Sequence, residues 1–147
     1  MIKYYWEDFA PGWTYESPAR PLSAEDIVRF AREYDPQIYH TDEQAAQATP
    51  FGGLIASGWQ TCGVMMRLMC DGYLLESACI GSPGLDEVRW LKPVRPGEAL
   101  RLRSTVLEQT PSQKDPGRGS VKFSWEGLNR SGEVVCLVVG RQYFRRR

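Results

Sequence analysis

The sequence predicts an α+β fold in which an antiparallel sheet packs against one buried helix. Before residue 85, apolar residues recur at the spacing of helices, and after it they recur at alternate positions, as in strands. The chain has 147 residues, of which 42% are hydrophobic and 24% are charged, and these values are typical of a globular domain. We therefore expect a single domain over residues 1–147.

The first helix is expected over the stretch LSAEDIVRFAREY, residues 22–34. Ser23 can cap its start, with Asp26 three residues later. One apolar stripe at helical spacing follows: Ile27, Phe30, Ala31 and Tyr34. Pro36 biases Asp35 toward extended backbone, so the helix should end near Tyr34, with Asp35 at the start of a turn.

Two more helices are expected before residue 76. Thr41 and Gln44 form a capping pattern for a short helix that Thr49-Pro50 ends, and Gly52-Gly53 then permits a sharp bend. Ser57 is a natural cap for the next helix, whose residues 62–75 are apolar on more than one face. A helix that is apolar nearly all round is typically buried, so this one should form the centre of the core.

Three strands joined by hairpin-like loops are expected after residue 85. Alternating apolar residues mark the first strands: Val88, Trp90, Leu100, Leu102, Val121, Phe123 and Trp125. The last strand is expected in the richer apolar run over residues 132–144. The segments 92–98, 110–120 and 129–133 are rich in Gly, Pro, Ser and Asn and should form the turns. Helices followed by strands favour an antiparallel sheet.

Charge and cysteine content exclude several classes of function. Lys plus Arg and Asp plus Glu both total 18, and this neutral balance gives no general attraction to nucleic acid or anionic membranes. With one histidine and no CxxC pair, the four cysteines do not form a zinc-ligand set, and we expect no cofactor. We see no signal peptide or apolar stretch long enough to span a bilayer, so a reduced, cytoplasmic protein is expected.

The only histidine, His40, lies in a loop five residues after Asp35, within the stretch DPQIYHTDEQAA. The stretch FGGLIASGW follows, and then the apolar helix. This order resembles the MaoC-like dehydratase and (R)-specific enoyl-CoA hydratase family. That family places Asp, any residue, Asn, Pro, an aliphatic residue and His before its central helix. Gln37 replaces the Asn, and Ser57 replaces the histidine that precedes the helix-opening glycine. The later stretch LDEVRWLKPVRPGEALRLRSTVLE also resembles the family's strand–turn–strand segment.

The resemblance implies a hotdog fold, an antiparallel β-sheet wrapped around a long buried central helix. It also implies reversible hydration of an enoyl thioester, or dehydration of a 3-hydroxyacyl thioester, with Asp35 and His40 activating one water. A histidine with a reference pKa of about 6.5 suits proton transfer near neutrality. The first N–H groups of the central helix, at Gly58, suit a developing oxyanion.

The same resemblance predicts further contacts and partners. Four residues are expected to line or shape the substrate site: Gln37, Tyr39, Ser57 and Trp59. The substrate would be an acyl-CoA or another acyl thioester, and a homodimer or higher homo-oligomer is expected. The CoA phosphates could meet any of four basic residues, among which the sequence does not choose: Arg67, Arg89, Lys92 and Arg95.

Two alternatives stay open at this point. A hotdog thioesterase would need a carboxylate on or near the central helix, where only Asp71 is available. A non-catalytic acyl-binding or assembly subunit would keep the fold, and the altered residues 36–39 are compatible with it. Side chains of Asp35 and His40 that point apart would favour that second alternative.

Overall fold

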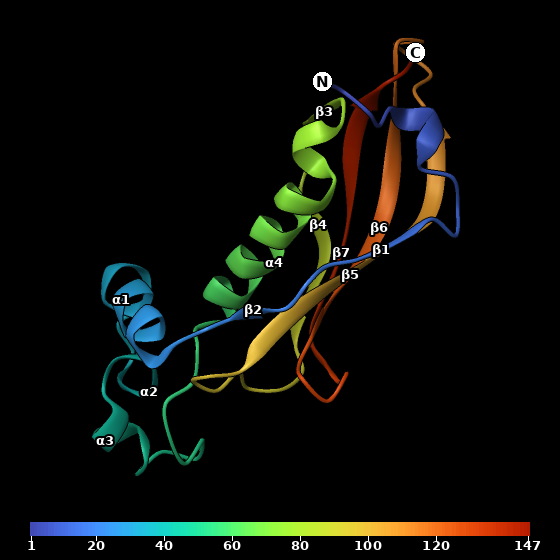
Figure 1. Cartoon of the computed structure of the whole chain (residues 1–147). Helices are drawn as coiled ribbons and strands as arrows, with labels where there is room; N and C mark the ends of the chain where they lie inside the picture. Colours follow the sequence, from blue (N-terminus) through green and yellow to red (C-terminus); the bar gives the residue numbers. More distant parts are fainter.

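The computed structural model describes all residues 1–147, and it has one long helix lying along one antiparallel sheet (Figure 1). The elements follow in the order η1 (Trp6–Asp8), β1 (Thr14–Glu16), β2 (Arg20–Pro21), α1 (Ala24–Tyr34), α2 (Ile38–Thr41), α3 (Glu43–Ala46), α4 (Gly58–Gly72), η2 (Leu74–Glu76), β3 (Cys79–Gly81), β4 (Leu85–Trp90), β5 (Ala99–Pro111), β6 (Arg118–Leu128) and β7 (Val134–Arg145). The predicted α+β class is confirmed, in the hotdog arrangement that the resemblance implies.

The sheet is built on β5, β6 and β7, which pair in sequence order. The short strands β1 and β2 add to the free edge of β5, and β3 and β4 add to β7. Alternate residues of β6 are buried, as the period-two pattern predicts. The prediction that all strands follow the helices is wrong for β1 and β2, which precede α1. Four strands, not the predicted three, follow residue 84, and the short β3 precedes them. Strands of two or three residues are too short to show alternation.

The central helix α4 begins where its cap predicts and presents one face to the sheet. The Ser57 side chain accepts a hydrogen bond from the Trp59 N–H and caps the helix. Met65, Leu68 and Met69 are buried in the core. The opposite face, with Met66 and the outward-pointing Trp59, stays at the surface of the single chain.

The segment between α1 and α4 differs from the predicted single helix over residues 41–48. It forms two separate turns, α2 and α3, and the cap of α3 is Asp42 rather than Thr41. The extended backbone of Asp42 interrupts the helix, and its carboxylate accepts the Ala45 N–H at 2.9 Å. The Thr41 hydroxyl instead donates to the carbonyl of Gln37. These turns and α1 lie together beside the N-terminal end of α4 (Figure 1).

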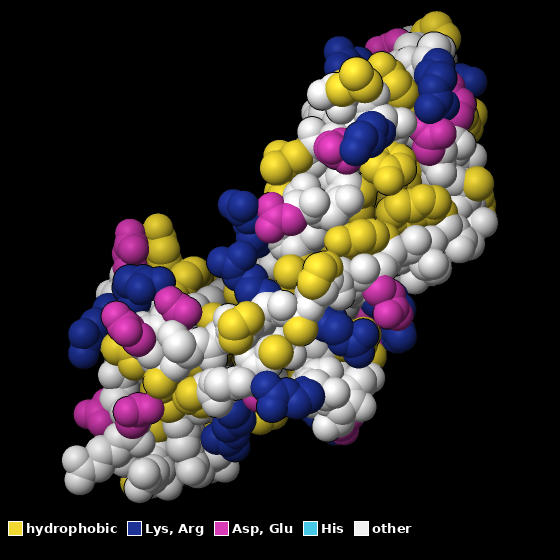
Figure 2. All heavy atoms as spheres, in the orientation of Figure 1, with side chains coloured by type: hydrophobic (Ala, Val, Ile, Leu, Met, Phe, Trp, Pro, Cys, Tyr) yellow, Lys and Arg dark blue, Asp and Glu magenta, His cyan; other side chains and the backbone are white.

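The opposite end of α4 is held by packed aromatic rings. Tyr73 lies directly after the helix and is 1% exposed, and its ring meets those of Phe9, Trp13 and Phe123. Figure 2 shows hydrophobic side chains gathered over this sheet-bearing part of the molecule, with charged side chains scattered around them. None of the helices has both the length and the hydropathy needed to cross a bilayer.

Candidate active site

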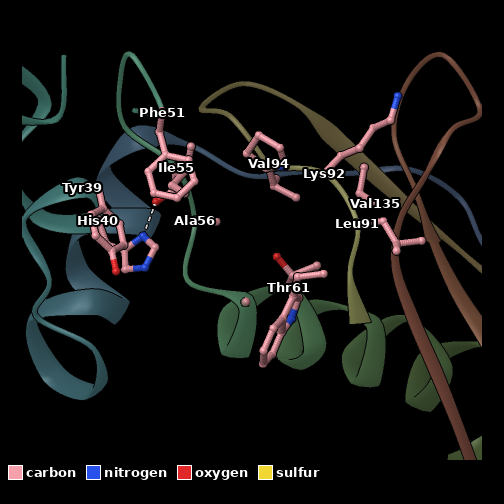
Figure 3. A pocket seen from close by; sticks show the side chains of 13 residues that line it. Tyr39, His40, Phe51, Ile55, Ala56, Thr61, Leu91, Lys92, Val94 and Val135 are labelled. Carbon is pink, nitrogen blue, oxygen red and sulfur yellow. Dashed lines mark hydrogen bonds between the residues drawn. The ribbon is translucent and has the colours of Figure 1, made fainter. Parts of the chain in front are cut away.

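A cavity of about 420 Å³ opens beside the N-terminal end of α4 (Figure 3). Its lining comes from α2, the loop that leads into α4, the first turn of α4, the segment after β4 and the start of β7. The lining is mainly apolar: Tyr39, His40, Phe51, Ile55, Ala56, Gly58, Thr61, Trp90, Leu91, Lys92, Pro93, Val94 and Val135. An apolar pocket with a few converging polar groups is the common form of a small-molecule site.

His40 is held by the backbone of the loop that enters α4. Its side chain is buried on α2, and Nδ1 lies 2.7 Å from the carbonyl oxygen of Ile55. A carbonyl can only accept a hydrogen bond, so Nδ1 carries the proton and donates it. In the neutral ring, Nε2 is therefore the nitrogen with a free lone pair, and it lies 3.3 Å from Oδ2 of Asp35.

Asp35 lies at the end of α1, as Pro36 predicts, and its carboxylate accepts hydrogen bonds from two side chains. Ser57 donates to Oδ2 at 2.8 Å, and Gln37 donates to Oδ1 at 2.7 Å. Burial raises the pKa of Asp35, but the hydrogen bonds from Gln37 and Ser57, together with the nearby His40, outweigh it. The net result is a pKa below the usual range. Asp35 is therefore built to stay ionised.

Gln37 and Tyr39 extend this network toward the cavity. The Tyr39 hydroxyl donates to the Gln37 side-chain oxygen, which leaves the Gln37 amide nitrogen free to donate to Asp35. The Tyr39 ring lines the cavity and lies 5.0 Å from the ring of Phe51. Gln37 thus acts on the carboxylate, whereas Tyr39 reaches both the network and the cavity.

Ser57 and Gly58 join the network to the helix start. Ser57 is fully buried, so its hydroxyl serves Asp35 and the helix cap. The Gly58 N–H makes no hydrogen bond within the protein, as expected for the first amide of a helix. A Cβ on Gly58 would overlap the ring of Trp90, so only glycine fits there.

Of two neighbouring tryptophans, the one predicted to contact substrate does not line the cavity, and the other does. Trp59 is 60% exposed, packs edge-on against Trp90 and is absent from the cavity lining. Trp90 itself lines the cavity, although the strand alternation marked it only as an apolar strand residue. Its closeness to Gly58 depends on how β4 crosses α4, and no spacing in the sequence signals this.

The four basic residues considered for phosphate contacts occupy different places. Arg67 pairs with Asp71 at 3.0 Å, and Arg89 pairs with the neighbouring Glu87. Arg95 donates to the carbonyl of Phe51 in the loop before α4. Lys92 pairs with Glu133 and is the only one of the four in the cavity lining.

Comparison with known proteins finds one family across most of the chain. The sequence model described as "MaoC like domain" matches residues 8–123. The uncharacterized protein YdeM of Bacillus subtilis is 32% identical over 118 residues, covering 80% of this chain and 84% of that protein. The 3-hydroxyacyl-thioester dehydratase Z of Mycobacterium tuberculosis is 33% identical over 103 residues, covering 69% of this chain and 66% of that protein.

A solved structure agrees with the sequence comparison. The crystal structure of the MaoC-like dehydratase from Rhodospirillum rubrum superposes with a TM-score of 0.92 at 40% identity, and the match covers 99% of both chains. A structure from Pseudomonas aeruginosa, the R-hydratase PhaJ1, is only 19% identical and supports the fold alone, with a TM-score of 0.75. The sequence and structural comparisons thus point to the same family.

Proposed function

The chain belongs to the MaoC-like domain family, and we propose that it is a hydro-lyase acting on acyl thioesters. It would add water to an enoyl thioester, or remove water from a 3-hydroxyacyl thioester. The single observation that carries this proposal is the placement of Asp35 Oδ2 and His40 Nε2, 3.3 Å apart, beside the first amide of α4. The dehydratase named among the relatives supports the substrate class.

In the proposed reaction, one water lies beside the carboxylate and the imidazole, on the cavity side, and bridges them. Both Asp35 Oδ2 and the unprotonated Nε2 of His40 are acceptors, so a water that donates one O–H to each would satisfy both. Its oxygen lone pairs are then free to attack the β-carbon of the enoyl group. Because Asp35 is held ionised, His40 is the group that takes the proton, and the carboxylate stabilises the imidazolium that forms.

The rest of the reaction moves charge onto the thioester. Attack at the β-carbon pushes electrons toward the thioester oxygen, and the unpaired Gly58 N–H is proposed to donate to that oxygen. The positive end of the α4 dipole adds to this stabilisation. The imidazolium then returns the proton to the α-carbon, so atoms and charge balance within one turnover.

The two alternative functions are less well supported. Asp71 pairs with Arg67 and lies near the far end of α4, outside the cavity lining, which disfavours it as a thioesterase carboxylate. A non-catalytic subunit would be favoured if Asp35 and His40 pointed apart, yet they face each other. The hydro-lyase proposal therefore stands ahead of both.

We also propose a homodimer. Strand β4 pairs only with β7, so its other edge is free. Large apolar side chains are exposed on β4 and on the adjacent face of α4: Trp59, Met66, Leu85 and Trp90. A second copy covering this face would remove that apolar surface from water.

The test is an absorbance assay with crotonyl-CoA and longer enoyl-CoAs. Loss of the conjugated enoyl absorbance is expected, and Asp35→Asn and His40→Ala should each reduce it about 10²- to 10⁴-fold with the fold retained by circular dichroism. Asp71→Asn is the matched control and should keep full activity. Release of free thiol without loss of the double bond would instead identify a thioesterase, and absence of turnover across the acyl series would reject the hydro-lyase.

A further inference from the structure

A second cluster of chemically active side chains lies one turn into α4, apart from Asp35 and His40. The Sγ atoms of Cys62 on α4 and Cys136 on β7 are 4.0 Å apart. Cys136 is also the strand partner of Trp90 in the β4–β7 register. Three elements distant in sequence thus bring two thiols and an indole together.

The two cysteines have different surroundings, which gives them different chemical roles. Cys136 is fully buried, whereas Cys62 is only partly buried in the single chain and lines a small apolar cavity of about 140 Å³. This cavity lies on the face that the proposed homodimer covers, so only an oxidant as small as peroxide is expected to reach Cys62 in the dimer. A hydrogen bond from Cys136 is the largest effect on Cys62, and with the Trp90 indole it lowers the pKa of the Cys62 thiol despite burial. The same hydrogen bond, with burial, raises the pKa of Cys136. Because Cys62 is the more exposed of the two, it is the thiol that an oxidant reaches first, and Cys136 is the buried thiol beside it.

We propose that Cys62 and Cys136 form an oxidation site that hydrogen peroxide converts to a disulfide between α4 and β7. The Cys62 thiolate attacks one peroxide oxygen, the O–O bond breaks, and hydroxide leaves with a proton as water, which produces a sulfenic acid. The Cys136 sulfur then attacks the Cys62 sulfur and displaces a second water as the S–S bond forms. Two thiols are oxidised by two electrons, and one peroxide is reduced to two waters.

The two sulfurs are already close to bonding distance. A disulfide needs them about 2 Å closer than they are now, which requires rotation of the side chains and a shift of α4 toward β7. The other two cysteines, Cys70 and Cys79, lie elsewhere, and no hydrogen bond joins either of them to Cys62. They provide an internal reference for thiol reactivity.

The disulfide would also act on the cavity through Trp90. This residue lies against Gly58 and lines the cavity, and its indole is one of the groups that stabilise the Cys62 thiolate. Oxidation removes that acceptor and pulls α4 toward β7, so the indole and the Gly58 amide should move relative to each other. This consequence for turnover rests on the proposed function, whereas formation of the disulfide does not.

The experiment treats the whole protein with near-stoichiometric hydrogen peroxide and maps its peptides by mass spectrometry, with and without dithiothreitol. We expect a Cys62–Cys136 linked peptide that dithiothreitol reverses, and a fall of about tenfold or more in hydration of crotonyl-CoA that recovers with it. The linkage and the fall should vanish in Cys62→Ser and in Cys136→Ala. The double variant Cys70→Ser/Cys79→Ser should keep both.

The outcomes separate this proposal from the proposed function. A linked peptide without any hydratase activity before oxidation would reject the enzyme but keep the thiol pair. Linkage through Cys70 or Cys79, or peroxide reaction that spares Cys62, would overturn the thiol pair. Cys136 is fully buried, so should Cys136→Ala fail to fold, Cys62→Ser and Cys62→Ala serve as the variants that should not form the linkage. In the wild-type protein, trapping of a sulfenic acid at Cys62 with dimedone tests the first step directly.

Discussion

The two ends of α4 carry two buried polar networks that differ in one respect. At the C-terminal end, the Tyr73 hydroxyl donates to Ser104 and accepts from the Trp125 indole, inside a shell of aromatic rings. At the N-terminal end, the partly buried Asp35 lies beside His40, which is buried and lines a cavity of about 420 Å³. The first network is closed, and the second has acceptors left over for a molecule from outside.

Polar groups that serve structure and polar groups that serve chemistry are thus distinct in this protein. In a closed network, the internal hydrogen bonds offset the free-energy cost of removing the polar groups from water, so no ligand is needed. Burial raises the pKa of Tyr73, which keeps the hydroxyl neutral and a good structural partner. The open network holds a carboxylate with a lowered pKa beside an imidazole, and charged groups with shifted pKa values in a cleft are typical of functional sites.

Of the variants that compare the two ends of α4, a matched pair of glycines should give the largest effect. A Cβ at Gly58 would overlap Trp90, and a Cβ at Gly72 would overlap Tyr15. Gly58→Ala should reduce hydration of crotonyl-CoA about 100-fold, because the indole and the proposed oxyanion donor are displaced. Gly72→Ala should leave turnover per folded molecule within about twofold while both variants lose about 1–3 kcal/mol.

Steady-state kinetics and urea denaturation of the two variants measure these effects. Equal losses of activity would show that overpacking anywhere along α4 disturbs the cavity, and the distinction between the two ends would fail.

A variant in the closed network should lose stability and keep its activity. Tyr73→Phe removes the hydroxyl that joins Ser104 and Trp125, both almost fully buried, and leaves their polar groups unpaired. We expect a loss of about 1–3 kcal/mol in the free energy of unfolding with unchanged kcat and KM. Chemical denaturation and the enoyl absorbance assay check the two halves, and a large fall in kcat would mean that the aromatic end communicates with the cavity.

Acid should distinguish the two networks by the sign of their pKa shifts. The folded-state pKa of Asp35 lies below its unfolded value, so the ionised carboxylate stabilises the fold above about pH 4, and this contribution is lost as the pH falls further. The stability gap between wild type and Asp35→Asn should therefore be present at pH 7 and shrink on approach to pH 3. The gap for Tyr73→Phe should stay constant over that range, because Tyr73 has its pKa raised and stays neutral throughout.

Urea titrations at closely spaced pH values measure both gaps. A gap for Asp35→Asn that stays constant down to pH 3 would mean that Gln37 and Ser57 do not favour the ionised form.

Sequence patterns predicted the parts of this molecule that depend on repetition. The stripe of α1 and the alternation of β5 to β7 repeat a local preference many times, so they could be recognised. The caps Ser23 and Ser57 could be recognised because each acts on the backbone of its own helix. The single turns α2 and α3 and the short strands β1 to β3 could not, because each is stabilised mainly by what it packs against.

The site divides in the same way. The spacing of Asp35 and His40, with the helix start after them, could be recognised from the family resemblance. Three contacts depend on how distant elements pack around α4. Ser57 donates to Asp35 at the end of α1, Trp90 of β4 covers Gly58, and Cys136 of β7 meets Cys62. No spacing in the sequence carries such packing, so these three contacts required the structure.

The smallest expected effect concerns the mouth of the cavity, where Lys92 lies. Lys92→Ala should raise KM for crotonyl-CoA about two- to fivefold with kcat unchanged, since exposed charge pairs contribute about 1 kcal/mol or less. Arg67→Ala is the matched control, because Arg67 pairs with Asp71 away from the cavity. It should leave both constants unchanged.

Comparing substrates with and without phosphates shows whether Lys92 acts through its charge or through its packing. Lys92 has its own partner in Glu133, so the phosphates of CoA must compete with that carboxylate, and the effect should weaken as salt is added. A crotonyl thioester of N-acetylcysteamine lacks the phosphates, and its KM should not change in Lys92→Ala. An equal rise in KM for both substrates would mean that Lys92 shapes the cavity through its aliphatic stem. The phosphates of CoA would then be expected beside Arg95, which donates to the loop before α4.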